Sequence, residues 1–320
     1  MKTKSFFFAL MGLIGLSACN KNQIKVEYPQ QEPQYCELKV AVNTGLVVKS
    51  TGAADAVTAN EKAVKSLQVF VFRGDFLDAY AKVSTSTLSL TCTAGSRKVY
   101  AVVNAPDLSS VSSLDALENT LVDLANNAPN ALVMAGVKPV TMPQTEVVTV
   151  EVTRHVARIA LNKISRAFES TSLGALKFTV KNIYVSDVAG TIKLNGSTSI
   201  SKWYNSGKTT TDLPSLLHDT VNTDIANNTS YQTPHYFYVM PNDNSTKTTK
   251  LVIEVSLGSE SFFYPLELPA IERNKSYEFQ NVKVLRPGSD DPDIPVNSSE
   301  ISFTVSVKDW DTIEIDEKII

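Results

Sequence analysis

The sequence contains few of the residue types that build catalytic and metal centres. Its 320 residues include only three histidines and three cysteines. There is no glycine-rich phosphate loop, no G-x-S-x-G, no H-E-x-x-H and no pair of C-x-x-C motifs. His155, His218 and His235 are scattered, and His155 stands among valines, as a structural residue of a strand does. We therefore expect a protein that is not an enzyme and that uses no cofactor and no metal.

The sequence also has no large excess of charge of one sign. The formal net charge is only -3 and no block of basic residues occurs, which argues against a nucleic-acid surface. Asp290, Asp291 and Asp293 form one small acidic group. The group lacks the glycine and glutamate spacing of a calcium-binding loop, so a solvated turn is favoured over a cation site.

No apolar run reaches the roughly 20 residues that a membrane-spanning helix needs. The longest run, Phe6–Leu16, follows two lysines and precedes Ser17, Ala18 and Cys19. Leu-Ser-Ala-Cys resembles the bacterial lipobox, in which the cysteine is acylated and becomes the first residue after cleavage. We expect residues 1–18 to be a lipoprotein signal peptide and Cys19 to carry lipid that holds the protein on a membrane. The alternative is a plain signal peptide with an incidental cysteine.

The remaining chain is rich in strand-forming valine and threonine. A polar spacer, residues 19–35, precedes an alternation in which Leu38, Val40 and Val42 share one strand face. Similar short apolar stretches recur to the C-terminus. Their number predicts an all-β fold of two tandem β-sandwich domains, residues 36–147 and 148–320.

One short helix is expected in the first domain. Ser112 or Ser113 is suited to cap it, and four leucines recur at helical spacing: Leu114, Leu117, Leu121 and Leu124. Residues 45–63 are small and polar, which predicts an exposed loop open to proteolysis. Cys36 and Cys92 remain either a disulfide or two free thiols, since export permits both states.

Six segments in a fixed order carry a family resemblance. They are LQVFVF at 67–72, CTAGSRKVYAVVNAP at 92–106, RHVARIALNKI at 154–164, FYVMPND at 237–243, IERNKSYEF at 271–279 and VSVKDW at 305–310. Together with the lipobox, this series resembles the fimbrillins, the type V pilus subunits of Bacteroidetes. The resemblance implies two transthyretin-like β-sandwich domains and a surface lipoprotein that polymerises into an adhesive fimbria with other pilus subunits.

The resemblance also implies how subunits join. A protease removes the first strand of the precursor, and a C-terminal strand of another subunit fills the groove. The released strand would carry Leu38, Val40 and Val42. The donor region would be residues 300–320, with apolar side chains at Ile301, Phe303, Val305, Val307, Ile313 and Ile315. The alternative for residues 301–307 is an ordinary last strand of their own domain.

The expected cleavage site departs from the family pattern. Stalk subunits of the family are cut after an arginine in the loop that follows the first strand, and this chain has no arginine before Arg73. The matching position is Lys49, followed by Ser50. We expect either a stalk subunit cut at this bond or an uncut membrane-anchor subunit.

A different class of function remains open beside these two. A surface glycan-binding lipoprotein would also be a lipidated β-sandwich protein, and it would need exposed aromatic platforms. Trp203 and the adjacent Tyr204 are the residues that offer one. The alternative for this pair is a hydrophobic plug over the core.

Overall fold

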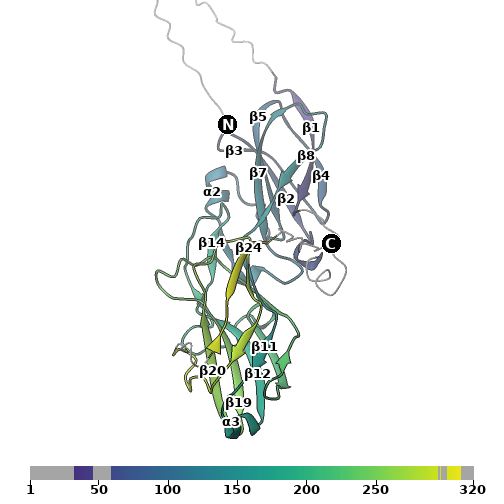
Figure 1. Ribbon diagram of the computed structural model, residues 1–320. Helices are drawn as coiled ribbons and strands as arrows, with labels where there is room; N and C mark the ends of the chain where they lie inside the picture. The colour runs from purple at the N-terminus through teal and green to yellow at the C-terminus, as the bar shows by residue number, and fades with distance from the viewer. Residues whose placement is uncertain (1–31, 46–58, 295, 297–300, 311–320) are drawn as a thin grey trace, which may run out of the picture. The chain divides into compact units, whose positions relative to one another are not determined.

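A computed structural model describes residues 32–45, 59–294, 296 and 301–310 (Figure 1). Within these residues strands dominate and the helices are short, which confirms the all-β sandwich prediction. Both sandwiches lie in the compact unit that begins at Gln34. None of the helices in the described residues has the length and apolar character needed to cross a membrane.

The first sandwich consists of two facing sheets. One has the order β4-β1-β8, formed by Thr87–Thr93, Tyr35–Asn43 and Val148–Glu151. The other has the order β3-β2-β5-β7-β9, formed by Phe76–Val83, Leu67–Arg73, Gly95–Val103, Met134–Met142 and Thr153–Arg154. Alternate residues of the two sheets meet in one buried cluster, which includes Leu38, Val40, Val69, Val99 and Val148.

The second sandwich is built from three four-stranded sheets. The first is β18-β10-β21-β24, formed by His235–Val239, Ala157–Leu161, Lys275–Phe279 and Val305–Asp309. The second is β17-β11-β22-β23, formed by Ser230–Tyr231, Ile164–Arg166, Val282–Val284 and Ile301–Ser302. The third is β16-β12-β19-β20, formed by His218–Asp224, Phe178–Ser186, Lys250–Leu257 and Glu260–Glu267.

The core of the second sandwich lies between these sheets. Ile159 and Leu161 of β10 are buried and share a cluster with Ile183, Ile253 and Phe279. The remaining strands form two small pairs, β13 (Val188–Ala189) with β15 (Trp203–Tyr204) and β14 (Thr191–Lys193) with β6 (Leu121–Asp123). Two further short helices are α3 (Thr171–Ala175) and α4 (Pro214–Leu217).

The predicted helix is shorter than its leucine pattern suggested. Helix α2 spans Leu114–Glu118, and the Ser113 side chain caps it by accepting a hydrogen bond from the Ala116 N–H. Leu121 lies instead in β6 and Leu124 begins a 3₁₀ turn, Leu124–Asn126. The helical prediction for these two leucines is wrong because residues 121–123 pair with β14, so tertiary pairing overrides the local period.

The boundary between the sandwiches also lies later than predicted. We expected the first domain to end at residue 147, but β8 pairs with β1 and β9 pairs with β7. The first sandwich therefore continues to Arg154. The alternation in residues 148–151 correctly indicated a strand, but a strand's period carries no information about which sheet it joins.

Candidate functional site

The first strand is an interior strand of its sheet. β1 pairs antiparallel with β4 through seven residue pairs, from Tyr35 with Thr93 to Ala41 with Thr87. On its other side it pairs parallel with β8, where Val40 faces Val148. Loss of β1 would therefore leave a slot with unpaired backbone groups on both walls.

The predicted apolar face of β1 points into the core. Leu38 and Val40 are 0% and 1% exposed, and Val42 is half-buried against the same cluster. The partial burial of Val42 fits its position near the end of the strand. Any strand that replaced β1 would need apolar residues at alternate positions to fill the two deep sites.

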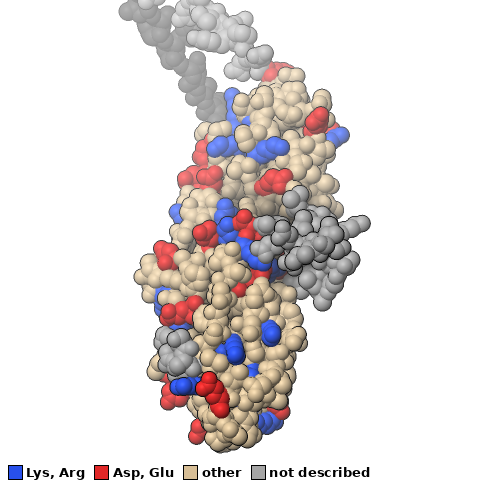
Figure 2. Space-filling view, in the orientation of Figure 1, with Lys and Arg blue, Asp and Glu red and all other residues tan. Residues whose placement is uncertain are grey.

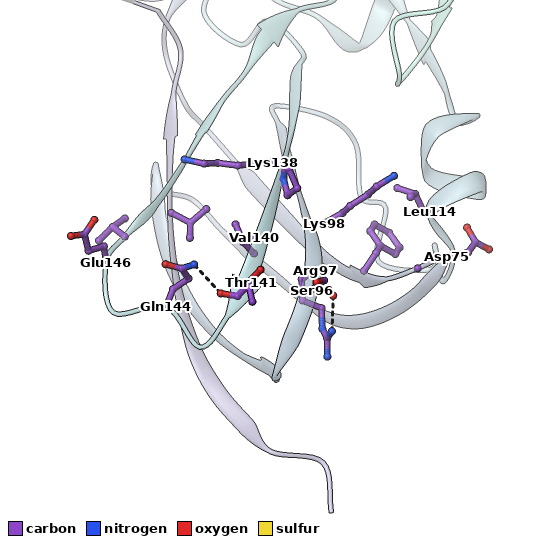
Figure 3. A pocket seen from close by; sticks show the side chains of 15 residues that line it. Asp75, Ser96, Arg97, Lys98, Leu114, Lys138, Val140, Thr141, Gln144 and Glu146 are labelled. Atoms are coloured by element: carbon purple, nitrogen blue, oxygen red, sulfur yellow. Dashed lines mark hydrogen bonds between the residues drawn. The ribbon is translucent and has the colours of Figure 1, made fainter. Parts of the chain in front are cut away.

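Along the first half of β1, the slot has a wall on one side only, formed by β4. β8 begins at Val148, so the residues of β1 before Val40 pair with β4 alone. A cavity of about 800 Å³ lies next to this point and reaches from Val147 and Val148 to Leu114. Figure 3 shows Lys98 and Lys138 across it, with Glu146 and Asp75 at opposite ends.

Residues on either side of 46–58, a range outside the described residues, are held together. The Thr44 hydroxyl donates to the carbonyl oxygen of Lys62 at 3.3 Å, and the Thr44 carbonyl accepts from Arg154 at 3.4 Å. Arg154 is 1% exposed and also donates to the carbonyl oxygen of Glu61 at 3.2 Å. Lys49 and Ser50, the predicted cleavage site, and Cys19 lie outside the described residues.

Cys36 and Cys92 lie side by side across the β1–β4 pair. They occupy directly opposite register positions, and both are free thiols. The Cys36 thiol donates to the Cys92 carbonyl oxygen at 3.5 Å. Burial, with a smaller contribution from the neighbouring Cys36, raises the pKa of the Cys92 thiol to about 11.

The first part of the predicted donor region lies in the chain's own sheets. Ile301 of β23 is buried, and the Phe303 ring lies 5.7 Å from the Phe279 ring between centroids. Val305 packs against the core, whereas Val307 of the edge strand β24 is 50% exposed. Ile313 and Ile315 lie outside the described residues. This placement corresponds to the alternative stated for residues 301–307, an ordinary last strand.

A buried carboxylate lies next to the last described residue. The Glu61 side chain is 0% exposed. It accepts hydrogen bonds from the Trp310 indole N–H and the Tyr238 hydroxyl, each at 2.9 Å, and from Arg158 at 3.1 Å. Glu61 thus links the segment just before β2 to Trp310, the last described residue.

The histidines do not form a site. His155 is fully buried, its Nε2 lies 2.8 Å from the Leu194 carbonyl oxygen, and burial lowers its pKa to about 4. His235 lies between Asp219, at 2.7 Å, and the Tyr231 hydroxyl, at 3.0 Å. Across the described parts of the chain, no three His, Cys, Asp or Glu side chains are grouped as metal ligands.

The residues considered for a glycan platform and for a cation site make contacts within the protein. Trp203 and Tyr204 are half-buried against the core, and the Tyr204 hydroxyl donates to Asp123 at 2.7 Å, which favours a plug over an exposed platform. Asp291 pairs with Lys208 at 2.9 Å. Figure 2 shows basic and acidic side chains interspersed on the visible face.

Sequence reasoning missed Glu61 and the β8 wall of the slot. Glu61 stood in a stretch interpreted as an exposed loop, and its three side-chain donors lie 97 to 249 residues away along the chain. No local pattern signals such a contact. The β8 alternation was visible, but its partner strand was not.

Comparison with known proteins identifies the family. Residues 36–201, just over half of the chain, match the model of the major fimbrial subunit protein (FimA). A comparison with curated proteins found no match.

Solved structures show the same fold. The chain is similar to a candidate cell adhesion protein from Bacteroides eggerthii, at 20% identity and a TM-score of 0.68, covering 87% of this chain and 97% of that one. It is also similar to a fimbrilin from Porphyromonas gingivalis, at 15% identity and a TM-score of 0.60, covering 87% and 98%. Because the family model matches more than half of the chain, including β4 and β8 on either side of β1, the chain belongs to the major fimbrial subunit family of cell-surface fimbriae.

Proposed function

We propose that this protein is a fimbrial stalk subunit that polymerises when β1 is cut away and a strand from another subunit takes its place. The observation that carries the proposal is the position of β1 between β4 and β8. An interior strand that is also the first strand can leave without threading the rest of the chain. Its departure exposes unpaired backbone on both sides and two deep apolar sites.

Residues 311–320 are the donor that fits this slot best. They number ten, against nine in β1, so at about 3.3 Å per residue both span about 30 Å. Ile313 and Ile315 have the spacing of Leu38 and Val40. Residues 301–309 would first have to leave β21 and β22 before they could act as donor residues.

The hydrogen bonds and apolar burial lost with β1 are largely regained from the incoming strand. The incoming strand restores the backbone hydrogen bonds to β4 and β8 that the departing strand gave up, each contributing about 1 kcal/mol net. Each isoleucine that replaces a leucine or valine recovers about 1.5–3 kcal/mol of burial. Cleavage drives the exchange toward the polymer, because a free β1 can diffuse away.

Export and anchoring precede assembly in this proposal. Cys19 carries the lipid that holds the precursor in the outer membrane, and cleavage between Lys49 and Ser50 removes lipid and β1 together. A subunit that stays uncut remains membrane-bound and acts as an anchor. Lysine in place of arginine implies a protease that accepts lysine.

Mass spectrometry of the N-terminus in purified surface fimbriae tests this proposal. We expect fimbrial subunits that begin at Ser50. Subunits along the fibre that retain acylated Cys19 would contradict the stalk assignment and would indicate the anchor function instead.

A further inference from the structure

β24 is held in its sheet from one side and through partly exposed contacts: Lys308 pairs with Glu278 at 3.5 Å, the Ser306 hydroxyl donates to the Glu278 carbonyl oxygen at 3.5 Å, and Asp309 pairs with Lys275. Among the described strands it is an edge strand and pairs only with β21, through five residue pairs from Lys275 with Asp309 to Phe279 with Val305. None of its side chains is fully buried. If a neighbour holds residues 311–320, tension reaches β24 at its C-terminal end and peels the pairs one at a time.

Trp310 stands at the point where that tension enters. Unlike β24 it is buried, at 6% exposure, and its ring stacks on Tyr238 with centroids 5.9 Å apart. The guanidinium groups of Arg154 and Arg158 lie 4.9 Å and 5.4 Å from the ring centroid. Its backbone N–H donates to the Asn274 carbonyl oxygen at 3.3 Å.

Glu61, which precedes β2 in the chain, completes this cluster. Its carboxylate accepts the Trp310 indole N–H and neutralises Arg158 in the same buried space. Glu61 is also close in sequence to the first sandwich, because β2 of its large sheet begins six residues later, at Leu67. A charge-assisted hydrogen bond without water around it is stronger than an exposed one.

We propose that Glu61 and Trp310 form a latch that holds the root of the C-terminal tail. The latch keeps β24 in its own sheet and makes residue 310 the boundary between the part of the chain that stays and the part given to a second copy. It also passes the pull of that copy into β2 of the first sandwich. The transmission of tension rests on the proposed strand exchange, whereas the hold on β24 exists in the single subunit.

Hydrogen exchange on the full-length precursor tests the hold directly. Trp310→Phe keeps a ring but removes the indole donor, and Glu61→Gln removes the charge. In both variants we expect the amides of residues 305–309 to exchange about tenfold faster or more, while β12 and β19 keep their protection. Unchanged protection of β24 in both variants would overturn the proposal.

Two controls separate the latch from general loosening. Trp203→Phe alters the other tryptophan of the chain, which lies in β15 with its ring centroid 5.7 Å from the Lys247 ammonium. Tyr238→Phe removes an equally short bond to the same carboxylate but leaves the Trp310 bond in place. We expect both to protect β24 as the unmodified protein does. Faster exchange of β24 in Trp203→Phe as well would overturn the proposal.

Single-molecule pulling between residue 320 and the first sandwich tests the load path. The unmodified chain should resist until a sandwich unfolds, whereas Glu61→Gln should add an early low-force step of a length that matches β24. Absence of that step would overturn the proposed load path. Failure of the unmodified protein to polymerise, with β24 still dependent on Trp310, would contradict the proposed function but leave the latch intact.

Discussion

Cys36 on β1 and Cys92 on β4 lie directly opposite each other as free thiols. Opposite residues of antiparallel strands have Cα atoms about 4.5–5.5 Å apart, within the range that a disulfide spans. A bond between them would tie the departing strand to one wall of its slot. The pair therefore gives an experimental means of blocking strand release.

Oxidation of this pair should stop polymerisation. Because burial raises the pKa of Cys92 to about 11, the thiol stays protonated at neutral pH and a catalysed oxidant is needed. We expect the oxidised precursor to give no SDS-resistant ladder after limited trypsin digestion, and reduction to restore it. Cys92→Ser should form ladders with or without oxidant. Ladders from fully oxidised protein would show that β1 does not need to leave.

His155 should make stability fall in mild acid. Its pKa is about 4 in the folded protein, because burial disfavours the charged ring, and about 6.5 when unfolded. Between these values only the unfolded state gains the proton. This contribution is therefore complete above pH 6.5 and declines toward pH 4, by about 2 kcal/mol at pH 5.

Denaturant unfolding at pH 7.5 and pH 5 measures this effect. His155→Gln should lose that part of the pH dependence, whereas His218→Gln, at a half-buried position, should keep it. Equal pH dependence in the unmodified protein and His155→Gln would contradict the assignment.

Leu161→Asp should unfold the second sandwich. Leu161 is 1% exposed on β10, between β18 and β21, so an aspartate there would bury an unpaired charge. We expect a loss of about 3 kcal/mol or more in the free energy of unfolding. Leu121→Asp is the matched control, since Leu121 is 48% exposed and should cost less than about 1 kcal/mol. Similar melting temperatures for the two variants would mean that the buried face is misassigned.

Lipidation of Cys19 can be tested separately from assembly. Cys19→Ala should leave a precursor without acyl chains that does not reach the outer surface. Metabolic labelling with a fatty-acid analogue measures this. Equal label in the variant and the unmodified protein would exclude Cys19 as the acylation site.

Local patterns in the sequence predicted the strands that are regular and half-buried. The alternation of Leu38, Val40 and Val42 predicted a strand here and its inward face, although β1 begins earlier, at Tyr35, a residue expected in the spacer. Ser113 was among the two predicted caps of the helix, because capping depends on neighbours in the chain. These features are local, and a sequence displays local features directly.

Features set by distant contacts were not predictable in this way. Leu121 and Leu124 continue the helical period of α2, yet β14 draws this stretch into a strand. Glu61 lies in a stretch of small and polar residues, and it is buried because Arg158, Tyr238 and Trp310 converge on it. Such side chains carry no local signal, since their burial is decided by residues far along the chain.

Deletion of residues 311–320 tests the central claim, strand exchange into the β1 slot, most directly. The shortened chain keeps Trp310 and all the described strands, so it should fold with an unchanged melting temperature. After limited trypsin digestion it should lose β1 yet form no SDS-resistant ladder, while the full chain forms one and Lys49→Ala does not. Ladder formation by the shortened chain equal to that of the full chain would contradict donation by residues 311–320.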